Sequence, residues 1–147
     1  MPLLIDFKSG DKIIINGAVI ENAGASSKVL VHNQAAILRG REILAEEESK
    51  TPASRAYFAL QCAYMFADKE EDYLKHFDGL LTDYLDACPS AKSIGDDIRA
   101  EIGDRQLYKA LKATQKLIKH ENELLQSLQQ DVKKANQQSA ESGAEGG

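Results

Sequence analysis

Gly10-Asp11-Lys12-Ile13-Ile14-Ile15-Asn16-Gly17-Ala18-Val19-Ile20 is the stretch of the chain that decides the fold. Two short apolar runs flank the dipeptide Asn16-Gly17. Asn-Gly between two apolar runs is typical of a tight β-hairpin, because both residues tolerate positive φ. The stretch therefore predicts two antiparallel strands, over residues 13–15 and 18–21.

Further predicted strands lie on either side of this hairpin. Residues 3–7 place Leu3, Ile5 and Phe7 on one face, residues 28–32 are rich in valine, and residues 36–38 predict a fifth strand. Several of these strands are apolar on both faces, whereas a solvated sheet would alternate more cleanly. We therefore expect both faces to be covered, either by the helices that follow or by a second copy in a homo-oligomer.

The rest of the chain predicts helices. Thr51-Pro52 is a helix start, because threonine caps the first turn and proline fits the first helical position. Further helices are predicted over residues 68–87 and around residues 94–102, and a long one runs from Asp104 to about Ala135 with a modest heptad pattern. The fold class is α+β: an antiparallel β-module over residues 1–45, a helical body with one long terminal helix over 46–136, and a disordered tail over 137–147.

Composition narrows the class of protein. The chain has 147 residues, is 43% hydrophobic and contains two cysteines, which we expect to be reduced thiols. Its beginning has no basic segment followed by a long apolar one, so nothing predicts export. The longest apolar run, residues 56–67, is too short to cross a bilayer. The expected location is the cytoplasm, away from membranes.

Motifs for catalysis and metal binding do not stand out in this sequence. The three histidines, at positions 32, 76 and 120, are scattered, and neither zinc, calcium nor nucleophile-elbow spacings occur. The sequence therefore predicts a protein that is not an enzyme, with no catalytic residues, no metal site and no cofactor.

Two groups of basic residues remain as candidate binding surfaces. The first lies in the predicted β-module and comprises Lys8, Lys12, Arg39 and Arg41. The second follows Arg105 on the long helix, at spacings that keep Lys109, Lys112 and Lys116 on one stripe. Residues 104–136 contain seven basic and four acidic residues, a net charge of +3, whereas residues 51–103 have a net charge of −5. Each group either contacts a polyanion or is ordinary solvated surface.

A family resemblance favours the first of these readings. The segment Gly10 to Asn22 resembles the opening of the bacterial flagellum biosynthesis repressor family, FlbT. Two later segments match that family in the same order, Leu38-Arg39 to Glu42-Ile43-Leu44 and Thr51 to Phe58. The likeness runs from about residue 1 to residue 135. At Gly40-Arg41-Glu42, which follows Arg39, the sequence departs from the other polar residues that we would expect in this family.

The resemblance implies a cytoplasmic post-transcriptional regulator of flagellin, a probable repressor. Such proteins resemble binders of the 5′ untranslated leader of flagellin mRNA that lower its translation or stability, although some relatives act as activators. RNA contact is then assigned to the two basic groups: Lys8, Lys12, Arg39 and Arg41 first, then Lys109, Lys112 and Lys116. The rival expectation is a protein-interaction adaptor that binds flagellin or another flagellar regulator, with indirect effects on mRNA.

Overall fold

The computed structural model describes the backbone of residues 2–145 and the side chains through residue 138. It confirms the α+β class, with small antiparallel sheets followed by helices. The strands are β1 (Leu3–Phe7), β2 (Lys12–Ile15), β3 (Ala18–Glu21), β4 (Ser27–Val31) and β5 (Ile37–Arg39). All five predicted strands are present, each within about one residue of the predicted bounds.

The strands form two antiparallel sheets. One sheet contains β1 and β4, and the other has the order β3-β2-β5. The β2–β3 hairpin turns at Asn16 and Gly17, whose φ values are +49° and +87°. The left-handed conformation at both residues confirms the tight turn predicted from this dipeptide.

Strand β2 is covered on both faces within one chain. Ile14 and its register partner Leu38 belong to the buried cluster shared with the helices. Ile13 points the opposite way and is buried together with Ile5 and Phe7 of β1, outside that cluster. Both faces of β2 are therefore buried within one chain, and a second copy stays a prediction. All four residues of β3 are exposed, by contrast.

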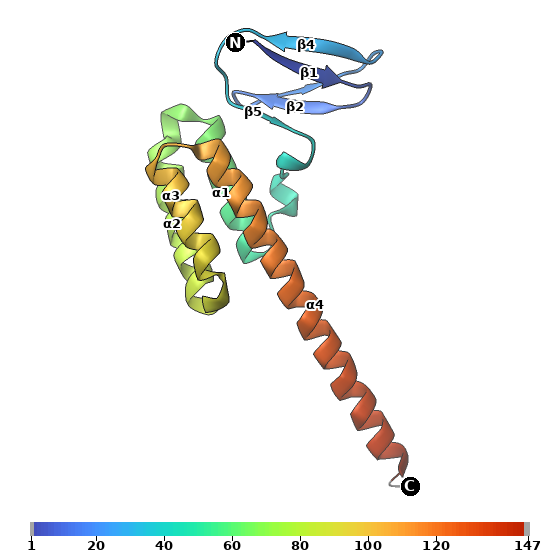
Figure 1. The fold of residues 1–147 in the computed structure, drawn as a ribbon. Helices are drawn as coiled ribbons and strands as arrows, with labels where there is room; N and C mark the ends of the chain where they lie inside the picture. Colours follow the sequence, from blue (N-terminus) through green and yellow to red (C-terminus); the bar gives the residue numbers. More distant parts are fainter. Residues whose placement is uncertain (1, 146–147) are drawn as a thin grey trace.

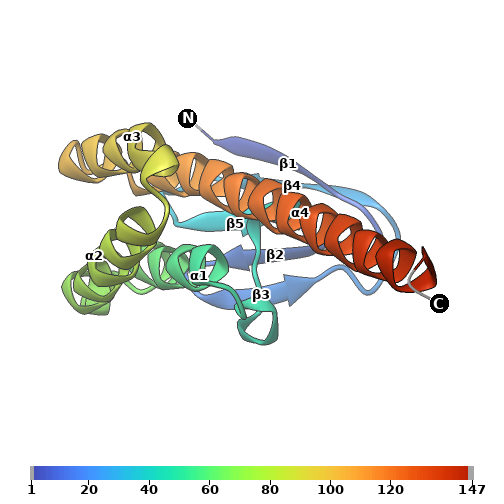
Figure 2. The same ribbon diagram turned by 90° about the horizontal axis from the view of Figure 1, so that it is seen from below.

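Four long helices form the body: α1 (Pro52–Met65), α2 (Glu70–Ala87), α3 (Lys92–Gly103) and α4 (Leu107–Glu145). Short 3-10 turns join the elements of the chain. One of them, η1 (Gly40–Glu42), links the β-module to the body. Thr51 caps α1 through its side-chain oxygen, as predicted. The core is built from apolar side chains of all four helices, including Leu60, Phe77, Leu81, Ile98, Leu111 and Leu117. The module lies above the body, with α1 and α4 passing beneath it (Figures 1 and 2).

Helix α4 begins three residues later than the sequence predicts. Arg105 has a φ of +59°, a left-handed conformation that ends the α3 turn and excludes this residue from the helix. At the other end α4 extends past the body (Figure 1). Residues 146 and 147 of the predicted tail lie outside the described residues, and the three-part division of the chain stays a prediction. Among the described helices, none is long and apolar enough to span a membrane.

Candidate nucleic-acid interface

Three of the four predicted cations of the β-module lie close together. Ile13 pairs with Arg39 across β2 and β5, which brings the neighbouring Lys12 beside Arg39. Lys12 and Arg39 line a shallow pocket of about 210 Å³ together with Asp6 and Asp11. An adjoining pocket also contains Asp6 and is lined by Lys8 and Lys28. Carboxylates are therefore interspersed with these cations.

The loop chemistry holds these residues in place. The backbone N–H of Lys8 donates to the Asp11 carboxylate at 3.0 Å and closes the turn between β1 and β2. At the far end of β5, Gly40 has a φ of +58°, which turns the chain directly after Arg39. Arg41 is exposed on η1 and lines neither pocket. The structure thus separates Arg41 from the other three candidates.

The cations of α4 face acidic side chains of α3. Lys109, Lys112 and Lys116 do share one stripe, and they line a pocket of about 300 Å³ with Asp97 and Glu101. No acidic residue stands between these lysines in the sequence, but the packing of α3 against α4 places two carboxylates beside them. The positive potential of the stripe is weakened accordingly.

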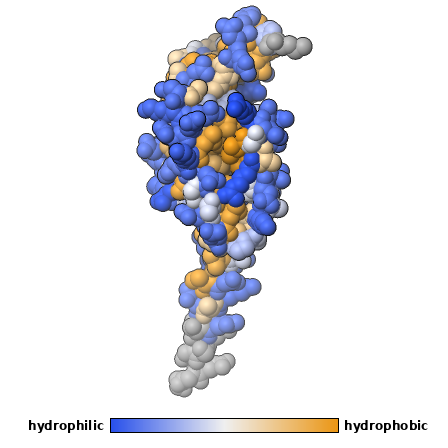
Figure 3. Space-filling model, turned by 90° about the vertical axis from the view of Figure 1, so that its left-hand side faces the viewer, coloured by the Kyte–Doolittle hydropathy of each residue, from blue (hydrophilic) through white to orange (hydrophobic). Residues whose placement is uncertain are grey.

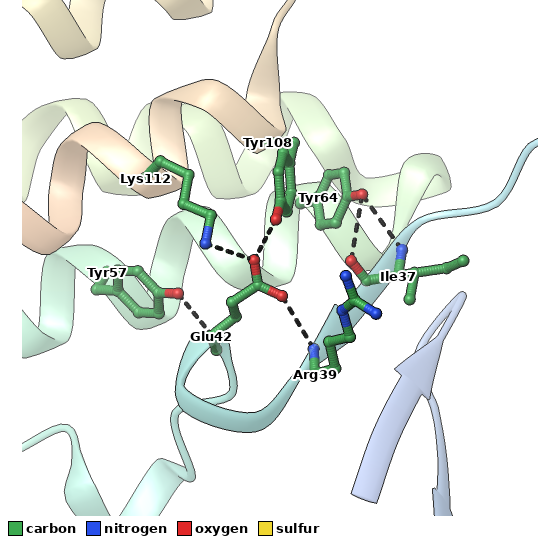
Figure 4. Close-up of polar contacts among 7 residues, drawn as sticks. All are labelled: Ile37, Arg39, Glu42, Tyr57, Tyr64, Tyr108 and Lys112. Atoms are coloured by element: carbon green, nitrogen blue, oxygen red, sulfur yellow. Dashed lines mark hydrogen bonds and ion pairs between the residues drawn. The ribbon is translucent and has the colours of Figure 1, made fainter. Parts of the chain in front are cut away.

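Glu42 connects the two groups. Glu42 is only 8% exposed, and its carboxylate accepts three hydrogen bonds (Figure 4). The donors are the Arg39 backbone N–H at 3.1 Å, the Lys112 ammonium at 2.8 Å and the Tyr108 hydroxyl. We call Arg39, Glu42, Tyr108 and Lys112 the Glu42 joint. It ties the end of the β-module to the first turns of α4.

The charges in the Glu42 joint stabilise one another. Burial on its own raises the pKa of Glu42, but the hydrogen bonds from Lys112, Tyr108 and the Arg39 amide outweigh burial and hold that pKa below its ordinary value of 4.5. The hydrogen bond to Glu42 raises the pKa of Lys112 in turn. Both groups are therefore charged at neutral pH, and Lys112 is already partnered within the chain.

Two tyrosines of α1 complete the attachment of the β-module (Figure 4). The Tyr57 hydroxyl donates to the backbone carbonyl of Glu42 at 2.6 Å. Burial raises the pKa of Tyr57 to about 12, so this hydroxyl keeps its proton at physiological pH. The Tyr64 hydroxyl accepts from the Ile37 N–H at 3.2 Å. These two hydroxyls therefore attach α1 to the end of the β-module.

Among the side chains of residues 2–138, none of Lys8, Lys12 and Arg39 forms an ion pair within 4.0 Å. The same part of the chain contains no group of three metal-ligating side chains. Sequence reasoning did not find the Glu42 joint, because Glu42 and Tyr108 are 66 residues apart and only the fold brings them together. Glu42 does stand in one of the family-like motifs, which was the single available signal.

Fold and site together define a small α+β protein whose candidate binding surface consists of exposed cations on the β-module and on the first half of α4. The chain belongs to the FlbT family: the family model described as flagellar protein FlbT matches residues 3–125. This confirms the resemblance of the opening motifs.

Several relatives cover most of the chain. It is 32% identical over 127 residues to a probable flagellum biosynthesis repressor protein FlbT of Caulobacter sp. (strain K31), covering 85% of this chain and 97% of the relative. It is 30% identical over 127 residues to the flagellum biosynthesis repressor protein FlbT of Caulobacter vibrioides (strain ATCC 19089 / CIP 103742 / CB 15), covering 85% and 90%. A Bradyrhizobium diazoefficiens relative, named probable flagellum biosynthesis repressor protein FlbT 1, is 34% identical over 125 residues, covering 84% and 85%. No solved structure matches the chain.

Proposed function

We propose that this protein is a cytoplasmic, non-enzymatic repressor of flagellum biosynthesis. It binds the 5′ untranslated leader of flagellin mRNA and lowers its translation or stability. Family membership supports the repressor role, since several relatives are named as flagellum biosynthesis repressors. The observation that supports the RNA part is the Glu42 joint, in which one carboxylate accepts from the backbone N–H of Arg39, in the first cation group, and from the ammonium of Lys112, in the second.

The unpaired cations are the expected RNA contacts. Lys12 and Arg39 on the module and Lys109 and Lys116 on α4 are exposed. A guanidinium matches phosphate with two parallel hydrogen bonds, and a lysine acts as a point charge. Lys112 has a different part in this proposal: its ammonium holds Glu42, so its first role is to position the two groups.

The test is binding of purified protein to the flagellin leader RNA across a salt series. Contacts to several phosphates predict a log–log slope near −0.7 per contacted phosphate of single-stranded RNA. Lys12→Glu with Arg39→Glu, or Lys109→Glu with Lys116→Glu, is expected to weaken binding about tenfold or more and to flatten the slope by about 1.4, for two lost contacts. Lys112 is left intact so that the joint survives.

Lys133→Glu with Lys134→Glu is the matched control, because it makes the same charge change on the projecting part of α4. Its affinity for the leader should stay within about twofold of the unmodified protein. Absence of leader binding even at low salt would refute the RNA proposal. If all three double variants lose affinity for the leader equally, the protein attracts RNA only as a nonspecific polyanion.

The rival function, an adaptor for flagellin or another flagellar regulator, is favoured by a different surface. Helices α2 and α3 flank a pocket of about 600 Å³ lined by Leu74, Phe77 and Ile102. Figure 3 shows an apolar patch ringed by hydrophilic residues on this side of the molecule. If Leu74→Glu abolishes co-purification with flagellin while leader binding persists, the chain has both functions. If leader binding is absent and flagellin binds, the adaptor replaces the repressor proposal.

A further inference from the structure

The apolar side of α4 is covered over only half of its length. Leu111 and Leu117 are 2% and 0% exposed, because they pack on the body. Leu125 and Leu128 continue the same pattern, yet they are 44% and 58% exposed. Every residue from 122 to 138 is exposed, and we call this segment the free half of α4. The free half presents to solvent the kind of surface that α4 buries one and two heptads earlier.

An apolar groove adjoins the free half of α4. It has a volume of about 350 Å³ and lies where the start of α1, the end of α2 and the middle of α4 meet. Its lining includes Pro52, Cys88 and Leu124, together with Leu125 and Leu128 of the free half. In Figure 3, apolar surface continues from the body onto the projecting part of α4. Groove and free half thus form one elongated apolar surface.

Carboxylates are the charged groups of this groove. Glu121 of α4 and Asp83 of α2 line it, and no lysine or arginine is among its lining residues in the described part of the chain. Glu121 is 6% exposed, and its carboxylate accepts a hydrogen bond from the Ala53 N–H at 2.9 Å. Among the side chains of residues 2–138, no cation lies within 4.0 Å of it. A desolvated carboxylate is stabilised by a cation, so the groove favours a partner that brings one.

Apolar lining and carboxylates together select a basic amphipathic helix. Leucine-like side chains three and four residues apart on such a helix would fill the groove, as those of α4 fill the body. A neighbouring lysine or arginine would lay its aliphatic part on the apolar lining and bring its cation to Glu121 and Asp83. The walls of the groove are helices and offer no strand edge to pair with an extended peptide.

The free half of a second copy is a poorer match by charge. It carries two acidic and two basic side chains, a net charge of zero. Its Asp131 follows Leu124 by seven residues and therefore lies on the same side of the helix. Docking this segment would bring a further carboxylate to a groove that already holds Glu121 and Asp83.

We propose that the groove between α1, α2 and α4 docks a basic amphipathic helix of a partner protein. Apolar side chains of that helix pack on Leu124, Leu125 and Leu128, and a lysine or arginine beside them pairs with Glu121 and Asp83. The groove shares no lining residue with the pockets of the cation groups or with the pocket between α2 and α3. The proposal therefore stands apart from both RNA binding and the adaptor function.

Binding of synthetic peptides tests the charge requirement. The probe is a fluorescently labelled peptide of about 15 residues, long enough to form a helix when bound. Its leucines recur at alternating spacings of three and four residues, with lysine beside them and alanine elsewhere. Fluorescence anisotropy should give a dissociation constant on the order of tens of micromolar. The same peptide with glutamine in place of lysine should bind about tenfold more weakly, and with glutamate more weakly still. A glutamate peptide that binds as tightly as the lysine peptide, or a lysine peptide that does not bind, would overturn the proposal.

Leu125→Glu with Leu128→Glu should abolish binding of the lysine peptide, although it adds two negative charges to the protein. Both side chains are exposed, so the circular dichroism of the variant should match that of the unmodified protein. Leu4→Glu with Leu30→Glu is the matched control, because these residues are 53% and 52% exposed on paired strands of the β-module. The control should bind the peptide like the unmodified protein. Loss of binding in the control, with binding kept in the groove variant, would contradict the proposed site.

Glu121→Gln separates charge from packing. The amide oxygen of glutamine can still accept from the Ala53 N–H, so the fold should persist. Affinity for the lysine peptide should fall about tenfold, whereas affinity for the glutamine peptide should stay the same. If both affinities fall equally, or neither falls, Glu121 does not pair with the cation of the partner and the proposal is wrong.

The mass in solution tests the competing occupant. Sedimentation equilibrium compares the unmodified protein with the Leu125→Glu, Leu128→Glu variant at tens of micromolar. We expect the two to have the same mass, because the groove docks a different protein. If a larger assembly falls to the chain mass of 16.1 kDa in this variant and persists in the β-module control, a second copy occupies the groove and the proposal is overturned.

Discussion

The two halves of α4 carry the same seven-residue pattern in different surroundings. Leu111, Leu117 and Glu121 of the first half are buried, whereas Leu125 and Leu128 of the second half are exposed. A heptad shows that a helix has an apolar side, but not whether anything covers it. In α4 the boundary falls at Glu121, where the body ends.

Leu117→Ala should reveal the largest difference between the halves. Leu117 is fully buried, and truncating a buried leucine costs about 3 kcal/mol in the free energy of unfolding through lost burial and a cavity. Leu128→Ala, on the exposed half, should change the stability of the monomer by less than about 0.5 kcal/mol. Urea unfolding at low protein concentration measures both. Equal losses would mean that the second half is packed in the monomer.

Glu121→Ala probes the boundary itself. Glu121 is 6% exposed, and its carboxylate accepts a hydrogen bond at 2.9 Å from the Ala53 N–H in the first turn of α1. Its removal leaves a buried donor unpaired at a helix N-terminus, so we expect a loss of about 2 kcal/mol. Glu123→Ala, two residues further along and exposed, is the control and should stay within about 0.5 kcal/mol. If both variants melt like the unmodified protein, the bond to Ala53 contributes nothing.

Lys112→Met should give the smallest effect, and one that depends on pH. The Lys112 side chain is half-exposed, so its ion pair with Glu42 is partly screened and we expect a loss of about 1 kcal/mol at pH 7. Because the folded-state pKa of Glu42 is lowered, its stabilisation is present above the unfolded pKa and is lost as the pH falls through the folded value. The difference in stability between the variant and the unmodified protein should therefore become smaller below pH 4.5.

Lys133→Met is the counterpart on the free half of α4. It should show no such narrowing, since Lys133 has no ion-pair partner among the side chains of residues 2–138. Melting temperatures measured from pH 7 down to pH 3 for both variants provide the comparison. If the stability lost in Lys112→Met does not change with pH, the aliphatic part of the lysine side chain, rather than its charge, stabilises the fold.

Local signals in the sequence predicted most of the fold. The Asn16-Gly17 turn, the strand alternation and the Thr51-Pro52 helix start each depend on a few neighbouring residues, and the structure has all three. The predicted start of α4 was wrong, because Arg105 takes a left-handed conformation that its residue type does not indicate.

The candidate site was only partly accessible from the sequence. The cations are visible as residue types, but the carboxylates that face them come from other elements: Asp97 and Glu101 from α3, and Glu42 from η1. Distant contacts of this kind leave no spacing pattern. The burial of the α4 heptad is equally invisible in the sequence. Leu111 and Leu125 occupy equivalent heptad positions, and only the packing of the other helices buries the first and leaves the second exposed.

The attachment of the β-module has a thermodynamic consequence. Separating the module from the body breaks the bonds of Glu42 to Tyr108 and Lys112 and also exposes Ile14 and Leu38, which pack in the helical core. Because these contacts are lost in one step, we expect sheet and helices to open as one cooperative unit. The amide proton of Arg39, donated to Glu42, should then exchange with solvent as slowly as the amides of α1.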